Sequence, residues 1–281
     1  MVMFPAVFYR ATCRRSFYEF VKYFWSHAFS SKFEKNDLIE YYCELFQYMT
    51  RKLWISNYNH INIDTDNVIE IRESTKNLNL VVPPNHSKTI IFNVFGPLWL
   101  WTIAPIKAIS IAHNKSLALQ IQSKWESIIN SLPFQRSFYD IKLTANSTTV
   151  LKNNKGRVLY SIDHNAFTDY NGDGIVDIII NHDRISTKTR KKDKEEIENA
   201  LNYFQNTIFS KIPDTTNCII MNIQHRLVAN DTTVDITNNK NLKNQYNFIT
   251  LPAIFNKTTH LVFPISVNQI KTFKKGEVLG K

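Results

Sequence analysis

The sequence predicts an α/β fold, a mostly parallel sheet flanked by helices, with a helical segment at the N-terminus. Two observations lead to this prediction: short, strongly apolar segments bounded by turn residues, and amphipathic helical segments that alternate with them. The chain has 281 residues, of which 43% are hydrophobic and 21% are charged. This composition supports a full hydrophobic core and excludes an intrinsically disordered chain.

The N-terminal part of the chain is predicted to be helical. Apolar residues recur at helical spacing in residues 14–29 and 36–53. Residues 54–76 are polar, rich in Asn and Asp, and without a clear period, which indicates a loop or a small insertion. We therefore expect an N-terminal helical region with an insertion over residues 1–77, and an α/β domain over residues 78–281.

Short apolar runs predict the strands of that domain at residues 78–82, 108–112, 175–180, 218–223 and 248–251. Residues 150–152 and 157–162 flank an Asn-Asn-Lys-Gly turn and predict a hairpin, because Asn and Gly accept positive φ. Helices are expected over residues 116–132 and 193–208, where apolar residues fall on one stripe.

One apolar segment resembles a membrane span in composition. Residues 89–104 read TIIFNVFGPLWLWTIA, which is about four residues short of the ~20 that cross a bilayer. Asn93, Gly96 and Pro97 interrupt the segment. We therefore expect a buried helix in the core and no membrane partner, with a transmembrane helix as the lesser alternative.

The charge balance favours polyanionic partners. Lys and Arg number 34 against 24 Asp and Glu, which gives a formal net charge of +10. Such a surplus favours nucleic acid first and an anionic membrane second. The three cysteines, Cys13, Cys43 and Cys218, are widely separated and have no metal-binding spacing. A reducing, cytoplasmic location fits this cysteine content.

Residues 80–89, Leu-Val-Val-Pro-Pro-Asn-His-Ser-Lys-Thr, join an expected strand to an expected helix. A phosphate-binding loop needs backbone N–H groups at a helix N-terminus, a Lys for the β- and γ-phosphates, and a Ser or Thr hydroxyl for Mg²⁺. Lys88 and Thr89 are in place for those two roles. Ser87 stands where such loops have Gly, which lacks the side chain that crowds the loop. From the residues alone, a simple strand-to-helix turn and a phosphate site are equal alternatives.

The wider sequence resembles the large terminase subunits, the ATPase–nuclease motors that package viral DNA. Residues 81–101 resemble the phosphate-loop region of that family, with Asn85 in place of Arg and Ser87 in place of Gly. Further matches follow in order at residues 108–118, 125–134, 155–161, 218–233, 251–254 and 276–279. The resemblance implies a P-loop NTPase-like fold and an ATP site formed by Pro84, Asn85, His86, Ser87, Lys88 and Thr89.

The second catalytic element of that family is an apolar strand followed by two acids, one for Mg²⁺ and one that orients the attacking water. The matching segment here is residues 177–183, Asp-Ile-Ile-Ile-Asn-His-Asp. In one alignment His182 replaces the first acid and Asp183 matches the second, whereas a one-residue slip makes Asp183 the metal acid. Either way one carboxylate is missing. The resemblance implies Asp183, His182 and Arg226 as catalytic positions, and Thr89 and Asp183 as ligands of Mg²⁺.

The resemblance covers residues 20–279 and implies the ATPase domain of an ATP-driven DNA-packaging motor. Its partners would be double-stranded DNA, a small terminase subunit and a portal. No downstream acidic cluster follows, so nuclease activity is not expected. Because Asn85, Ser87 and His182 depart from the family pattern, we expect a truncated prophage gene product with impaired catalysis. The sequence leaves open whether ATP is hydrolysed, and the alternative is a non-catalytic, basic DNA-binding prophage remnant.

Two further patterns have competing explanations. Residues 169–177 fit the opening of an EF-hand-type calcium loop, but its twelfth position is Ile180 instead of a bidentate Glu, so a Gly-rich turn is favoured. Residues 188–194 (KTRKKDK) are basic enough to contact a DNA backbone, although such a run is more commonly a solvated helix start.

Overall fold

A computed structural model of the protein describes residues 6–53, 68–69, 75–171, 175–182, 211, 217–225, 236, 243–266 and 269–280. Its N-terminal helices are α1 (Ala6–Arg15), α2 (Phe17–Ala28) and α3 (Asp37–Met49), followed by the short 3₁₀ helix η1 (Arg51–Leu53). The later helices are η2 (Ile90–Phe95), α4 (Gly96–Ile103), α5 (Lys115–Ile129), α6 (Leu132–Ser137) and α7 (His164–Thr168).

The described residues form an eight-stranded sheet with the strand order β4-β5-β6-β3-β7-β8-β2-β9. The strands are β2 (Asn77–Val81), β3 (Lys107–Ala112), β4 (Leu143–Asn146), β5 (Val150–Asn153), β6 (Val158–Asp163), β7 (Ile178–His182), β8 (Ile219–Gln224) and β9 (Tyr246–Thr250). The strands from β6 to β9 in this order pair in parallel, and β4 and β5 add an antiparallel hairpin at one edge. The carboxyl ends of β3, β7, β8 and β2 therefore lie along the same edge of the sheet.

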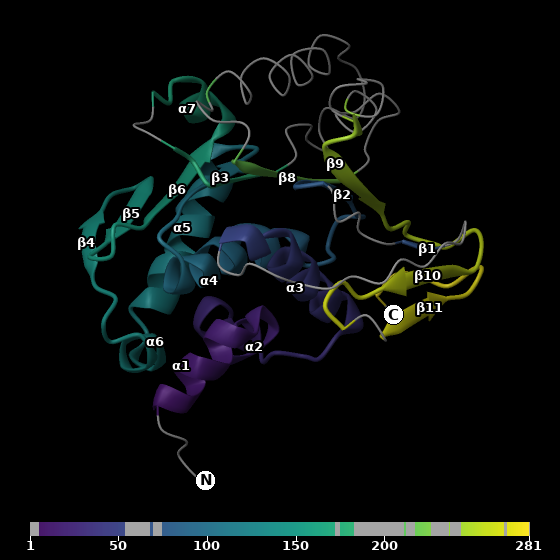
Figure 1. Ribbon diagram of the computed structural model, residues 1–281, viewed down its shortest axis with the longest axis horizontal. Coiled ribbons are helices and arrows are strands. Elements are labelled where there is room, and N and C mark those ends of the chain that lie inside the picture. The colour runs from purple at the N-terminus through teal and green to yellow at the C-terminus, as the bar shows by residue number, and fades with distance from the viewer. Residues whose placement is uncertain are drawn as a thin grey trace.

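Helices cover both faces of this sheet, as the strands' apolar sequences require. In Figure 1, α1 to α6 lie on one side of the sheet and α7 lies on the other. The larger hydrophobic core joins α1 to α5 to the first face, and a smaller core lies on the opposite face. A second, three-stranded sheet is formed by β1 (Val68–Ile69), β10 (Thr259–Val262) and β11 (Ile270–Phe273).

The structure confirms the predicted α/β fold class and most of the predicted strands. The strand expected over residues 175–180 instead begins at Ile178, where its pairing with β3 begins. Asp177 explains the later start, because its carboxylate accepts a hydrogen bond from the Lys107 N–H at 2.7 Å, and Ile175 before it is 59% exposed. The helix expected over residues 193–208 and most of residues 54–76 lie outside the described residues.

The apolar segment at residues 89–104 forms a buried helix, as expected. One continuous helical run extends from residue 88 to residue 103 and comprises the π-helical η2 and α4. Asn93 is fully buried in it and donates hydrogen bonds to Ser110 Oγ (2.9 Å) and Ile180 O (3.4 Å), which tie the helix to β3 and β7. Of the helices described, none has the length and apolar character needed to cross a bilayer.

A row of buried amide side chains crosses the centre of the sheet. Asn222 donates a hydrogen bond to Asn79 at 2.8 Å and accepts one from Asn181 at 2.8 Å. These residues are direct register partners on β2, β8 and β7. A slip of one residue would move each amide to the opposite face and leave buried polar groups without partners. The amide row therefore fixes the register of these three strands.

The turn between β2 and the long helix has an unusual backbone. Asn85 and Ser87 have φ angles of 65° and 57°, in the left-handed region that favours glycine, whereas His86 between them does not. Ile91 N–H donates to Ser87 O at 3.0 Å, so helical hydrogen bonding starts at Ser87. Alternating left-handed and other conformations turn successive N–H groups to one side, which is the geometry of an anion-binding nest.

Gly96 allows the long helix to pack closely on α3. A Cβ at position 96 would lie 2.5 Å from Cε2 of the buried Phe46. Alanine normally stabilises a helix interior by about 1 kcal/mol relative to glycine, but we expect Gly96→Ala to destabilise the protein by about 1–3 kcal/mol through overpacking. Denaturant unfolding measures this change. Adding Phe46→Leu should recover part of the loss, and a Gly96→Ala protein as stable as wild type would contradict the close packing.

Ser87 is strained by its positive φ. Ser87→Gly should therefore stabilise the protein by about 0.5–1 kcal/mol, because relief of the left-handed conformation outweighs the added freedom of the unfolded chain. Ser116→Gly in the first turn of α5 is the matched control and should destabilise by a similar amount, since glycine is unfavourable in a helix. Thermal and denaturant unfolding of both variants measure the difference. Two equal losses would mean that the turn at Ser87 is not left-handed.

Candidate functional site

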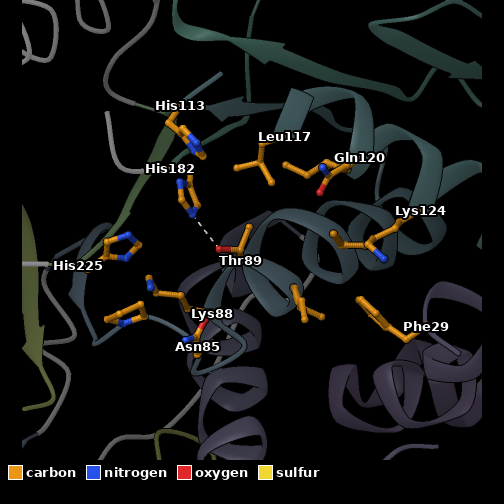
Figure 2. Close-up of a pocket in the computed structure, with 14 residues that line it drawn as sticks. Phe29, Asn85, Lys88, Thr89, His113, Leu117, Gln120, Lys124, His182 and His225 are labelled. Carbon is orange, nitrogen blue, oxygen red and sulfur yellow. Dashed lines mark hydrogen bonds between the residues drawn. The ribbon is translucent and has the colours of Figure 1, made fainter. Parts of the chain in front are cut away.

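A cavity of about 460 Å³ opens at the edge of the sheet where β2, β3, β7 and β8 end. Its walls come from the β2–helix turn, from residues at these strand ends, from α5 and from the segment after α2 (Figure 2). The lining residues are Phe29, Pro84, Asn85, Lys88, Thr89, Ile90, Val94, His113, Leu117, Gln120, Ile121, Lys124, His182 and His225. Ligands of open α/β sheets bind at this edge.

Lys88 and Thr89 begin the helical run directly after the left-handed turn. Lys88 is only 3% exposed, and its Nζ donates a hydrogen bond to Pro83 O at 3.4 Å. This contact folds the side chain back over its own turn, next to the cavity. Thr89 points its hydroxyl across the cavity toward the end of β7 (Figure 2).

His182, the last residue of β7, contacts Thr89 directly. Thr89 Oγ1 and His182 Nε2 form a hydrogen bond of 2.8 Å, drawn as a dashed line in Figure 2. Burial lowers the pKa of His182 to about 3, and the nearby charge of Lys88 acts in the same direction. His164 supports the strand end from the opposite face by donating from Nε2 to His182 O at 3.1 Å. The imidazole of His182 is therefore neutral at physiological pH.

Two more histidines surround His182. The ring centroids of His113 and His225 lie 5.6 Å and 6.1 Å from that of His182. Burial, followed by the charges of Lys88 and His113, lowers the pKa of His225 to about 4. Burial also lowers the pKa of His113. This side of the cavity thus offers neutral ring nitrogens beside a buried lysine.

The opposite end of the cavity is apolar. Phe29, Leu117 and Ile121 contribute to it, and Lys124 lies at its rim (Figure 2). Lys124 Nζ is 3.8 Å from the centroid of the Phe29 ring and donates to Ala28 O at 2.9 Å. These contacts hold the segment after α2 against α5 and keep this wall of the cavity in place.

His86 faces away from the cavity. Its Nδ1 lies 2.7 Å from Pro84 O and its Nε2 lies 3.1 Å from Leu279 O. A Cβ at Gly280 would lie 3.3 Å from the His86 ring. His86 therefore joins the turn to the C-terminal segment.

The structure brings most of the predicted site residues together. Pro84, Asn85, Lys88, Thr89 and His182 line one cavity, and Ser87 shapes the turn below it. The other predicted catalytic residues, Asp183 and Arg226, lie outside the described residues.

Sequence reasoning missed four residues that line the cavity. His113 and His225 each follow directly after a parallel strand, a position that could have marked them as site residues. Phe29 and Lys124 reach the cavity only because the segment after α2 packs on α5, and no local pattern in the sequence indicates this contact.

The described donors do not fit the Mg²⁺ that the resemblance implies. Mg²⁺ takes oxygen ligands, whereas ring nitrogens suit transition metals. The hydroxyl of Thr89 is bonded to His182, and none of the lining residues, all of them described, is Asp or Glu. Within the described ranges, no group of three or more His, Cys, Asp or Glu side chains could hold a metal ion, which also applies to the calcium alternative.

The sequence matches no protein-family model and no curated protein. Among solved structures, a mutant of the large terminase ATPase domain of Thermus phage P74-26 has a TM-score of 0.44 and 8% identity, over 64% of this chain and 78% of that one. The large terminase of bacteriophage HK97 has a TM-score of 0.46 and 13% identity, over 75% and 43%. The bacteriophage Phi-29 genome packaging motor assembly has a TM-score of 0.35 and 14% identity, over 52% and 42%. The chain thus spans less than half the length of the last two, and similarity at this level does not identify its activity.

Proposed function

We propose that this chain is a nucleotide-binding domain of the terminase ATPase type, with ATP bound on the turn of residues 83–89. The observation that carries the proposal is the backbone of that turn, where two non-glycine residues, Asn85 and Ser87, hold positive φ immediately before the buried Lys88. Each such residue costs about 1–2 kcal/mol. Strain of this kind persists where the surrounding structure enforces it, typically at ligand-binding sites.

In this proposal the turn binds phosphate mainly through its backbone. Residues 84–87 present N–H groups at the start of the helical run, where the helix dipole adds positive potential. Lys88 supplies the charged donor beside them. The apolar walls at Phe29, Leu117 and Ile121 suit the base and sugar of a nucleotide, and a cavity of about 460 Å³ is within the range for such ligands.

We propose that hydrolysis is slow or absent. Efficient phosphoryl transfer requires a group that orients or deprotonates the attacking water. Among the described lining residues, the candidates are neutral histidines, and His182 has a pKa of about 3. A base this weak accepts a proton poorly at neutral pH. Impaired catalysis follows from this substitution at the end of β7.

The wider role remains a proposal that rests on the resemblance. It comprises ATP-driven DNA packaging with double-stranded DNA, a small terminase subunit and a portal as partners. The net charge of +10 favours contact with DNA. The same charge supports the alternative, a non-catalytic DNA-binding remnant with no nucleotide site.

Lys88→Met tests nucleotide binding at the turn. The substitution keeps the length of the side chain and removes its charge, so we expect the affinity for a fluorescent ATP analogue to fall at least about tenfold, in line with the ~1.5–3 kcal/mol of a charged hydrogen bond. Equilibrium fluorescence titration measures the dissociation constant. Lys152→Met on β5, an exposed lysine at the hairpin edge of the sheet, is the matched control and should bind as wild type does.

Equal affinities of the Lys88→Met and Lys152→Met proteins would contradict the assignment. If neither protein nor wild type bound nucleotide, while wild type was retained on double-stranded DNA and released by salt, the alternative function would be favoured.

A further inference from the structure

We propose that the cavity binds the phosphate groups of its nucleotide without a divalent metal ion, with His182 in the place of a metal-holding carboxylate. This inference rests on the proposed function, because it concerns the same cavity. It follows from the mismatch between the described donors and Mg²⁺, and three features of the cavity support it.

The first feature is the hydrogen bond between Thr89 and His182. A hydroxyl that holds a metal needs its oxygen lone pair directed at the ion, but Thr89 Oγ1 is 2.8 Å from His182 Nε2. A metal at this hydroxyl would displace the imidazole. His182 is 5% exposed, so its ring nitrogen would lose a partner in a site with little access to water. The contact between these two side chains thus opposes metal binding at Thr89.

The second feature is the charge of the lining. Lys88 and Lys124 are cationic, the histidines are neutral, and Asp and Glu are absent from the lining, whose residues are all described. A site with a carboxylate at position 182 would be one unit more negative and would need a cation between itself and the phosphates. With imidazole there, the phosphates meet positive and neutral groups directly, and an added Mg²⁺ would be repelled by the lysines.

The third feature is the second nitrogen of the His182 ring. Nδ1 is buried and has no hydrogen-bond partner among the described residues. When Thr89 donates its hydroxyl hydrogen to Nε2, the neutral ring carries its own hydrogen on Nδ1. The ring lies between Thr89 and His113 on the cavity wall (Figure 2), where this N–H can donate to an anionic oxygen. The ligand would then satisfy a buried donor that the protein leaves open.

The test compares wild type, His182→Asp and His182→Asn in titrations with a fluorescent ATP analogue, each in EDTA and in excess Mg²⁺. For wild type and His182→Asn, we expect dissociation constants that differ by less than about threefold between the two buffers. His182→Asp places a carboxylate beside the phosphates, so its affinity in EDTA should fall at least about tenfold and recover by a similar factor in Mg²⁺. Asn is the matched control because it has the shape of Asp without the charge.

Wild-type binding that is at least about tenfold tighter in Mg²⁺ than in EDTA overturns the inference and leaves the proposed function standing. Absence of wild-type binding in both buffers overturns the proposed function itself. A folded His182→Asp protein whose affinity does not respond to Mg²⁺ contradicts the place given to His182. If that variant fails to fold, as circular dichroism would show, the two wild-type titrations decide the question alone.

Discussion

The candidate site depends on the register of three neighbouring parallel strands, β2, β8 and β7. The left-handed turn, His225 and His182 follow or end these strands, and they face one cavity only when the three strands end level with one another. The buried amides of Asn79, Asn222 and Asn181 impose that register, because they are hydrogen-bonded only when they stand opposite each other. The amides lie on one face of the sheet and the cavity residues on the other, so the alternation of side chains along a strand links the two. A buried polar row thus sets the geometry of a site with which it shares no contact.

The chemistry of the cavity follows from one substitution at the end of β7. A carboxylate at this position would give the site a negative charge and a metal requirement. The imidazole of His182 gives a neutral ring bonded to Thr89. Its pKa is lowered by burial and by Lys88, so the ring stays neutral beside the lysine and adds no repulsion to it. The cavity keeps the geometry of a phosphate site, but its electrostatics suit an anion alone. It also lacks, within the described residues, a strong base for hydrolysis, and slow turnover and metal-free binding then have the same cause.

The sequence was sufficient to predict the fold class, because buried parallel strands are continuous apolar runs and the helices between them are amphipathic. It also predicted the turn and the helix that begins at Lys88. It could not decide between a bland turn and a phosphate site, because Ser87 is a poor predictor of positive φ and only the folded chain shows that the conformation is kept. The start of β7 was misplaced because the hydrogen bond from Lys107 to Asp177 is a tertiary contact. For the same reason Phe29 and Lys124 were missed. The partner of Thr89 could not be chosen either, since two alignments of residues 177–183 were open until the register of β7 was known.

The central claim is that His182 faces Thr89 and is hydrogen-bonded to it. A double-mutant cycle with Thr89→Val and His182→Phe measures this contact directly through the free energies of unfolding of wild type, both single variants and the double variant. Since the two side chains share a buried hydrogen bond, the account predicts a coupling energy of about 0.5–1.5 kcal/mol. Changes that add to within about 0.3 kcal/mol would show that the two side chains do not interact, and would contradict the account.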